Sequence, residues 1–288
     1  MSRQRYRKFS QVNYSDYNGG MLHLRSLSMM EVEAEHGRDF PFSLPIFQPF
    51  APLEFTAPVT FLVGENGCGK STLLEAIACA AGSITVGSES VATDPSLVAV
   101  RSLARHLRLV WNKRTRKGFF LRAEDFFGFA RRVSQMRQEL QDDLLDVDRE
   151  YSNRSEHARG LARLPLAGEL HGLQARYGDG LDTQSHGESF LKLFQARFVP
   201  GGLYLLDEPE APLSPVRQLA LIALLKEMVA QDGQFIIATH SPILMAFPGA
   251  VILSFDGGRI QPVEYENLEH VTLTRTFLND PQAFLRRL

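Results

Sequence analysis

The sequence predicts an α/β fold with a parallel core sheet, an antiparallel β part before it and a mostly helical insertion. The runs 59–63, 203–206 and 235–238 are short and, apart from Thr60, apolar, as are strands that a sheet buries on both faces. A helical pattern follows each run, and this alternation is typical of parallel sheets.

The composition is that of a globular protein. The 288 residues are 44% hydrophobic and 22% charged, with a formal net charge of −2, so any nucleic-acid-binding surface must be local. The chain has neither a run of about 18 apolar residues nor an apolar N-terminal leader, so we expect no direct membrane insertion and a cytoplasmic location. Cys68 and Cys79 are too few for a metal site or a disulfide framework, and we expect them to be reduced.

We expect a single domain over residues 21–288, after a flexible basic tail at 1–20. Prolines interrupt the segment 21–59, which favours short antiparallel strands over long helices. The helical insertion is expected at about 83–184.

Two elements are predicted inside this insertion. Residues 107–111 and 119–122 are expected to pair as a β-hairpin. Residues 126–163 are predicted to be helical and highly charged, and are too short for the long coiled-coil arm of a chromosome-organising ATPase.

The last third of the chain continues the alternation. Ser214 and Pro215 predict a helix start, because serine caps helices and proline suits the first helical position. Residues 251–263 are expected to form a hairpin. The apolar face of the helix is predicted at Val216, Leu219, Ala220, Ala223, Leu224 and Met228.

A glycine-rich segment between the first apolar run and the next helix matches the P-loop pattern. Its backbone N–H groups and the helix N-terminus would bind phosphates, the lysine would contact the β- and γ-phosphates, and the Ser71 hydroxyl suits Mg²⁺. The alternative is an accidental glycine-rich turn. The predicted ATP-binding residues are Gly64, Glu65, Asn66, Gly67, Cys68, Gly69, Lys70, Ser71 and Thr72.

Two further apolar runs end in polar residues. Asp207 and Glu208 follow the second run and would reach the edge of the sheet that carries the P-loop. Asp207 suits Mg²⁺ binding, and Glu208 suits the activation of an attacking water. His240 follows the third run and could contact the γ-phosphate. Alone, the carboxylates could equally be an exposed acidic turn, and a lone histidine is more often structural.

A fourth motif contains Ser185, Gly187 and Glu188, and a helical pattern follows it. A serine, a glycine and a helix N-terminus together suit a second phosphate-binding surface. A plain capping box, in which Ser185 and Glu188 cap the helix reciprocally, is the other interpretation.

Taken in order, the four motifs resemble those of the ABC ATPase family, particularly its soluble recombination-repair and stand-alone groups. The resemblance covers about residues 21–262. It implies that Ser185, Gly187 and Glu188 bind the nucleotide of a partner subunit. It also implies a head-to-tail homodimer that encloses two ATP molecules, with residues 211–214 crossing the interface.

Some positions depart from the family pattern. His186 stands where the family usually has a glycine, and no clear glutamine loop is present. Glu124 is a candidate for the role of that glutamine near Mg²⁺. Phe40 and Phe42 are candidates for stacking on adenine.

The resemblance implies Mg²⁺-dependent ATP hydrolysis. Our leading hypothesis is a soluble mechanical ATPase in DNA metabolism or defence; the alternatives are the nucleotide-binding subunit of a transporter and an ATP-dependent scaffold for another protein. Residues 101–117 contain seven Lys/Arg and no acid, which would suit DNA phosphates. They could instead be a solvated surface that balances the acidic run 139–150.

Overall fold

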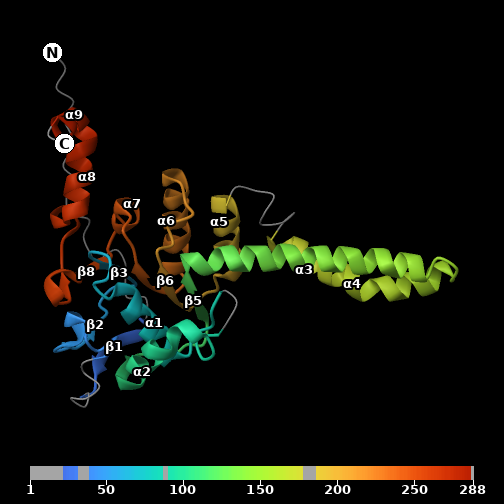
Figure 1. Ribbon diagram of the computed structural model, residues 1–288, viewed down its shortest axis with the longest axis horizontal. Helices are drawn as coiled ribbons and strands as arrows, with labels where there is room; N and C mark the ends of the chain where they lie inside the picture. Colours follow the sequence, from blue (N-terminus) through green and yellow to red (C-terminus); the bar gives the residue numbers. More distant parts are fainter. Residues whose placement is uncertain (1–21, 32–38, 87–89, 178–185, 287–288) are drawn as a thin grey trace.

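The computed structural model describes residues 22–31, 39–86, 90–177 and 186–286, and these contain two β-sheets (Figure 1). The larger sheet has the strand order β5-β6-β7-β3-β8-β9, and the smaller has the order β2-β1-β4. The strands are β1 (Leu24–Met29), β2 (Leu53–Glu54), β3 (Val59–Val63), β4 (Leu107–Trp111), β5 (Gly118–Arg122), β6 (Leu203–Asp207), β7 (Gln234–Ala238), β8 (Val251–Ser254) and β9 (Gln261–Pro262).

The larger sheet confirms the predicted α/β fold. Strands β5, β6, β7, β3 and β8 pair in parallel, and β9 closes the edge as the antiparallel partner of β8, as predicted for that hairpin. Every residue of β3 and β7 is buried, and all of them except Thr60 and Gln234 are apolar, as expected for strands that are covered on both faces. Because the strands are parallel, β3, β5, β6 and β7 bring their carboxyl ends to one edge.

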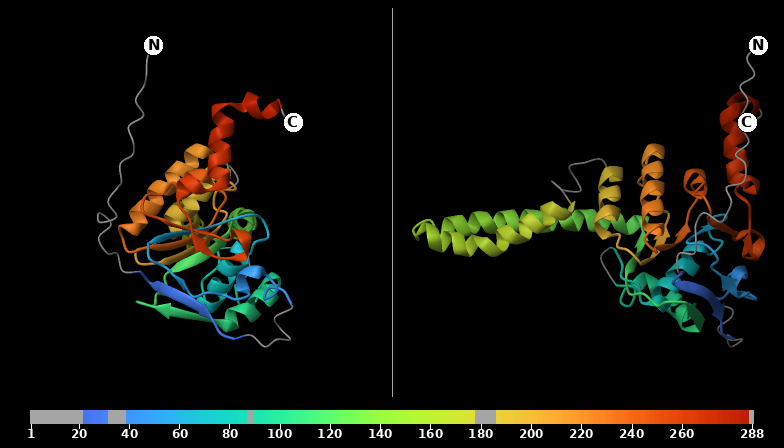
Figure 2. Two further views of the ribbon diagram at one scale, coloured as in Figure 1. Left: turned by 90° about the vertical axis from the view of Figure 1, so that its left-hand side faces the viewer. Right: turned by 180° about the vertical axis from the view of Figure 1, so that it is seen from behind.

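Helices cover both faces of the larger sheet (Figure 2). One face packs against α5, α6 and α7, and the other against α1, α2 and the smaller sheet. Tyr204 and Leu206 of β6 belong to the first core, and Leu203 and Leu205 to the second. The helices are α1 (Lys70–Ala81), α2 (Val98–His106), α3 (Ala123–Glu150), α4 (Glu156–Tyr177), α5 (His186–Arg197), α6 (Pro215–Val229), α7 (Pro242–Met245), α8 (Glu269–Asn279) and α9 (Pro281–Leu285).

The predicted hairpin of β4 with β5 is wrong. Strand β4 pairs antiparallel with β1, whereas β5 pairs in parallel with β6, so the loop 112–117 passes from one sheet to the other. At its end Gly118 has a φ of 104°, and a Cβ there would lie 1.9 Å from the carbonyl oxygen of Leu203. Only glycine therefore allows β5 to enter the larger sheet at this point.

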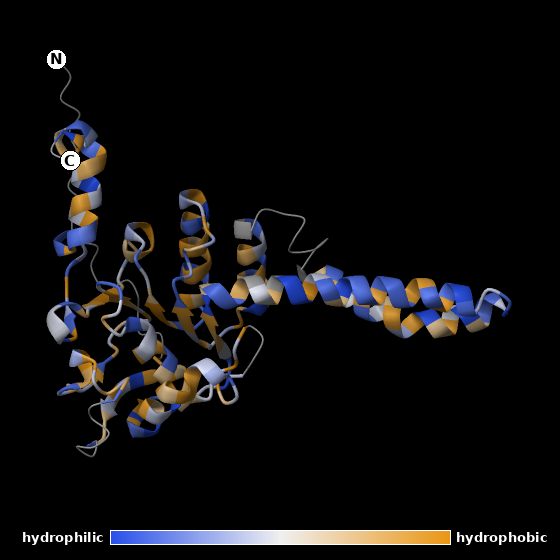
Figure 3. Cartoon of the chain, in the orientation of Figure 1, coloured by the Kyte–Doolittle hydropathy of each residue, from blue (hydrophilic) through white to orange (hydrophobic). Residues whose placement is uncertain are grey.

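Helices α3 and α4 form a long antiparallel arm that projects from the body (Figures 1 and 3). Helix α3 follows β5 directly and has 28 residues, and Pro165 lies inside α4. The arm contains most of the predicted charged helical segment, which divides into two helices at residues 151–155.

The predicted apolar face of α6 is largely wrong. Val216 and Leu219 are 76% and 59% exposed, while the buried residues are Leu221, Leu225, Met228 and Val229. The helix begins at Pro215 after Ser214, as predicted, although no side chain caps it.

Two remaining observations concern membranes and thiols. Within the described part of the chain, no helix is long and apolar enough to cross a membrane. Cys68 and Cys79 are free cysteines.

Candidate nucleotide-binding and catalytic site

The P-loop connects β3 to α1 at the carboxyl edge of the larger sheet. Gly64, Gly67 and Gly69 have φ values of 142°, 79° and 101°, which side chains rarely allow. A Cβ on Gly69 would lie 2.6 Å from the side chain of Ile46, so this glycine also permits close packing. Around Gly67 a Cβ would meet nothing within 4 Å, which leaves that part of the loop open to a ligand.

Lys70 is buried at the first position of α1. Its Nζ donates hydrogen bonds of 2.8 Å to the carbonyl oxygens of Gly64 and Glu65. The ammonium group is therefore held inside the curve of the loop, beside the N-terminus of a twelve-residue helix. A helix N-terminus and a fixed cation together favour a phosphate group.

Ser71 and Asp207 meet beside the loop. The Ser71 hydroxyl donates a hydrogen bond of 3.1 Å to the Asp207 carboxylate. Burial is the main cause that raises the pKa of Asp207 to about 7, and the nearby charges of Glu75 and Glu208 add to it. A buried carboxylate with too little compensating positive charge suits a cation.

These donors fit Mg²⁺. A hydroxyl and a carboxylate are hard oxygen ligands, and Mg²⁺ in nucleotide sites takes few protein ligands besides phosphates and water. Among the described residues, no group of three or more His, Cys, Asp or Glu side chains could hold a metal by itself. The two protein oxygens suit a metal whose other ligands are phosphates and water.

Glu208 follows β6 with a strained backbone. Its φ of 47° lies in the left-handed region, which is uncommon for a residue other than glycine and occurs often at functional sites. Its N–H donates a hydrogen bond of 2.9 Å to the carbonyl oxygen of Ala238, which ties the turn to β7. The carboxylate is 49% exposed and lies 3.9 Å from the imidazole of His240. It is thus accessible to water at the edge of the sheet.

The structure holds His240 through a residue that the sequence motifs did not single out. The Glu210 carboxylate accepts a hydrogen bond of 2.7 Å from the backbone N–H of His240. Ser241 then caps α7 by accepting hydrogen bonds from the N–H groups of Ile243 and Leu244. The imidazole Nε2 of His240 is buried without a hydrogen-bond partner.

The C-terminal segment adds a second histidine that sequence reasoning missed. His270 lies in the first turn of α8. The nearby Leu268 and Val271 are buried in the same core cluster as Leu244 and Met245 of α7. Its Nε2 is also buried without a hydrogen-bond partner. Burial is the main cause that lowers the pKa of His270, and the positive field of His240 lowers it further.

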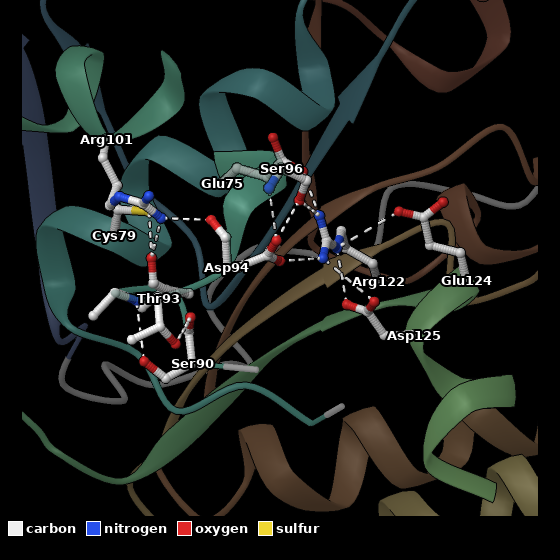
Figure 4. Close-up of polar contacts among 12 residues, drawn as sticks. Glu75, Cys79, Ser90, Thr93, Asp94, Ser96, Arg101, Arg122, Glu124 and Asp125 are labelled. Carbon is white, nitrogen blue, oxygen red and sulfur yellow. Dashed lines mark hydrogen bonds and ion pairs between the residues drawn. The ribbon is translucent and has the colours of Figure 1, made fainter. Parts of the chain in front are cut away.

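The carboxyl end of β5 carries a cluster around Arg122 (Figure 4). The guanidinium lies 2.7–3.3 Å from carboxylates on three other segments. Glu124, the candidate for the glutamine role, is 77% exposed and lies 3.7 Å from this guanidinium. The carboxylates at 2.7–3.3 Å belong to Glu75, Asp94 and Asp125.

Part of the fourth motif, including Ser185, lies outside the described residues, and Gly187 is described only through the backbone of α5. Helix α5 begins at His186, and Glu188 forms ion pairs of 3.7 Å with Lys192 and 3.9 Å with Arg217. Helices α5 and α1 cover opposite faces of the sheet, so the sheet lies between α5 and the P-loop helix within one chain.

The stacking candidates differ in exposure. Phe42 is buried, with its ring 5.2 Å from that of His106. Phe40 is 57% exposed. Of the two, only Phe40 has a free aromatic face.

Two family profiles match the chain. One, described as "AAA domain", matches residues 46–152. The other, described as "AAA domain, putative AbiEii toxin, Type IV TA system", matches residues 104–246. Together these ranges include the P-loop, the carboxylates after β6 and the histidine after β7.

Curated relatives and solved structures are similar to most of the chain. The cobalt import ATP-binding proteins CbiO of Salmonella paratyphi A and Salmonella typhimurium are each 26% identical to this chain. The alignment with the first covers 78% of this chain and 81% of the relative, and the alignment with the second covers 77% and 79%. The structure of cbiO1 from Clostridium perfringens, part of the ABC transporter complex cbiONQ, is 17% identical with a TM-score of 0.40, over 83% of this chain and 91% of that chain. The SMC head domain from Thermotoga maritima is 17% identical with a TM-score of 0.41, over 84% of this chain and 100% of that chain.

Proposed function

Because this chain is a P-loop ATPase of the ABC type, we propose that two copies close head to tail around two molecules of ATP and hydrolyse them with Mg²⁺. The separation of α5 from the P-loop helix supports this arrangement, since the fourth motif would then serve the nucleotide of the partner. The exposed apolar residues Val216 and Leu219, which follow the segment 211–214, are also suited to burial by a second copy.

The observation that carries the proposal is the hydrogen bond of Ser71 to Asp207 beside the strained Glu208. Ser71 and Asp207 would hold Mg²⁺, which when bound supplies positive charge to the β- and γ-phosphates. Lys70 would bind the same phosphates. Glu208 would orient the attacking water and accept its proton, and His240 would contact the γ-phosphate.

The test uses Glu208→Gln, which keeps the shape of the side chain but cannot accept the proton. We expect ATP binding to persist, turnover to fall at least about a hundredfold, and light scattering to show a dimer when ATP is present. Adding Ser185→Arg should return the protein to a monomer. A monomer under both conditions, or unchanged turnover, would contradict the proposal.

We further propose that the ATPase acts on DNA through the loop 112–117. The loop borders a cavity of about 300 Å³ whose lining includes Trp111, Arg114, Arg116 and Lys117. It lies at the amino end of β5, opposite the nucleotide edge, whereas the acidic run belongs to the arm. No carboxylate among the described residues pairs with the cations of this loop, so their charge is available to phosphates.

The DNA interaction is tested by neutralising Lys113, Arg114, Arg116 and Lys117 together and titrating labelled DNA at two salt concentrations, with and without ATP. Affinity should fall, and the slope of log affinity against log salt should flatten by roughly one for each phosphate that the variant no longer binds. Replacing Arg149 and Arg154 on the arm with glutamine is the control for the loss of cations elsewhere on the surface. If the parent protein shows no salt-dependent binding, DNA is not the partner.

A transporter subunit is the second candidate, and the CbiO relatives favour it. It predicts a membrane protein that co-purifies with the tagged chain from detergent extracts. ATP-dependent retention of DNA without such a protein would decide against it.

A further inference from the structure

The Arg122 cluster joins four segments at the nucleotide edge (Figure 4). Arg122 Nε lies 2.8 Å from Asp125 at the start of the arm, and Nη2 lies 2.7 Å from Asp94 in the loop before α2. Nη1 lies 3.3 Å from Glu75 of α1 and donates to the Ser96 hydroxyl. The Arg122 side chain is only 12% exposed, so water screens these contacts weakly.

This cluster lies directly beside the proposed metal ligands. Arg122 and Asp207 are register partners in the parallel pair of β5 with β6, and each is the last residue of its strand. Phe120 and Leu205, two residues earlier, belong to the core on the α1 side of the sheet. Because side chains two residues apart on a strand point to the same face, Arg122 and Asp207 also lie on the α1 side. Glu75 follows Ser71 by four residues on α1, so both side chains lie on one helix face.

Four links therefore close a ring around the site. The Ser71 hydroxyl binds Asp207, Asp207 neighbours Arg122 across the sheet, Arg122 binds Glu75, and one helical turn leads from Glu75 back to Ser71. Glu75 is 15% exposed, and apart from Arg122 no described side chain forms an ion pair with it. Its negative charge also contributes to the raised pKa of Asp207, after burial and against the Ser71 hydrogen bond.

We propose that Arg122 is a positioning residue for the Mg²⁺ site: it fixes the Glu75 carboxylate behind Ser71 and Asp207, where that carboxylate accepts hydrogen bonds from metal-bound water. The inference rests on the Mg²⁺-dependent function proposed above and adds two residues to it. Such outer partners orient a metal site without binding the metal, and their loss weakens metal affinity by about 10–100-fold.

A purely structural clamp is the competing explanation. Asp94 and Asp125 bind the same guanidinium and tie the loop before α2 to the arm, so losing Arg122 could simply loosen the fold. The two explanations differ in their dependence on Mg²⁺. A structural defect weakens nucleotide binding with or without the metal, whereas a positioning defect weakens only the binding that the metal adds.

The experiment measures the affinity of a fluorescent ATP analogue in EDTA and across a Mg²⁺ titration. The variants are Glu75→Gln, Arg122→Gln, Arg122→Lys and the Glu75→Gln/Arg122→Gln pair. Arg149→Gln is the control, because it breaks an exposed ion pair on the arm. Glu75→Gln keeps the size of the side chain and an oxygen that can accept from Arg122, so it tests the charge even if Arg122→Gln does not fold.

In EDTA, Glu75→Gln should bind the analogue within about twofold of the parent, while its half-saturating Mg²⁺ concentration rises about tenfold or more. Arg122→Gln should show the same rise and Arg122→Lys a smaller one. The double variant should be no worse than either single variant, because both changes remove one interaction.

Equal weakening with and without Mg²⁺, or additive effects in the double variant, would overturn the inference. If nucleotide binding by the parent depends on Mg²⁺ and the variants have the same half-saturating Mg²⁺ concentration as the parent, the inference is overturned while the proposed function stays intact. A parent whose nucleotide binding is independent of Mg²⁺ would overturn both.

Discussion

Asp207→Asn should stabilise the nucleotide-free protein, and more so at higher pH. Burial, aided by nearby carboxylates, raises the pKa of Asp207 from its ordinary value of 3.8 to about 7. Between these two values the unfolded chain releases a proton that the folded protein retains. The free energy of unfolding therefore falls as the pH rises through this window, and the penalty is complete above pH 7.

The size of the effect follows from the two pKa values. The gap between 3.8 and about 7 corresponds to on the order of 4 kcal/mol above pH 7, and to less than about 2 kcal/mol at pH 5. Asparagine has nearly the same shape, can still accept the Ser71 hydrogen bond and carries no charge. The variant should therefore recover most of this free energy while losing Mg²⁺-dependent ATP binding.

Urea unfolding of both proteins at pH 5 and pH 8, without nucleotide or metal, measures the difference. Glu266→Gln, which removes an exposed carboxylate, is the control and should change little at either pH. A stabilisation of equal size at both pH values, or a loss of stability at pH 8, would refute the argument that the buried charge of Asp207 costs free energy.

Three further variants test other parts of the structure. Lys70→Ala should weaken ATP binding at least about tenfold, and an affinity within about threefold of the parent would remove the role given to this lysine. Tyr204→Phe should lower the free energy of unfolding in urea by about 1–3 kcal/mol, because the backbone N–H and carbonyl of Val199 lose the Tyr204 hydroxyl as their hydrogen-bond partner. Gly118→Ala should cost more than Gly82→Ala, which we expect to cost about 1–2 kcal/mol. Both glycines have positive φ, but only at Gly118 would a Cβ collide with Leu203, so equal losses would contradict this account.

The core of the fold could be predicted because its signals are local. A largely apolar run, a glycine-rich turn and a helix start lie within about twenty residues of each other around the P-loop. The segment from Val59 to Ala81 therefore has the predicted elements: a strand, the P-loop and a helix.

The partners of β4 and β5 could not be predicted in the same way. Both strands look like halves of a hairpin, and the six residues between them suit a turn. The decision between hairpin and crossover depends on Leu24–Met29 and Leu203–Asp207, which are remote in sequence. Pairing with these strands fixes the register of both.

The face of α6 was misassigned because the helix is apolar on nearly every side. Its leucines at 219, 221, 224 and 225 are spread around the helix, so their spacing does not indicate which face is buried. The Arg122 cluster was missed for another reason: its charged members come from positions 75 to 125, and single charged residues far apart give no local pattern.

The arm has a mechanical consequence. Helix α3 has 28 residues, and its first three turns are held in the core through Phe126 and Val133. The remaining part, residues 134–150, is a rod about 25 Å long, so a pivot of about 10° where it leaves the core would carry its far end through about 4 Å. A pair of fluorophores, one on the body and one at the tip, could follow such a displacement during turnover.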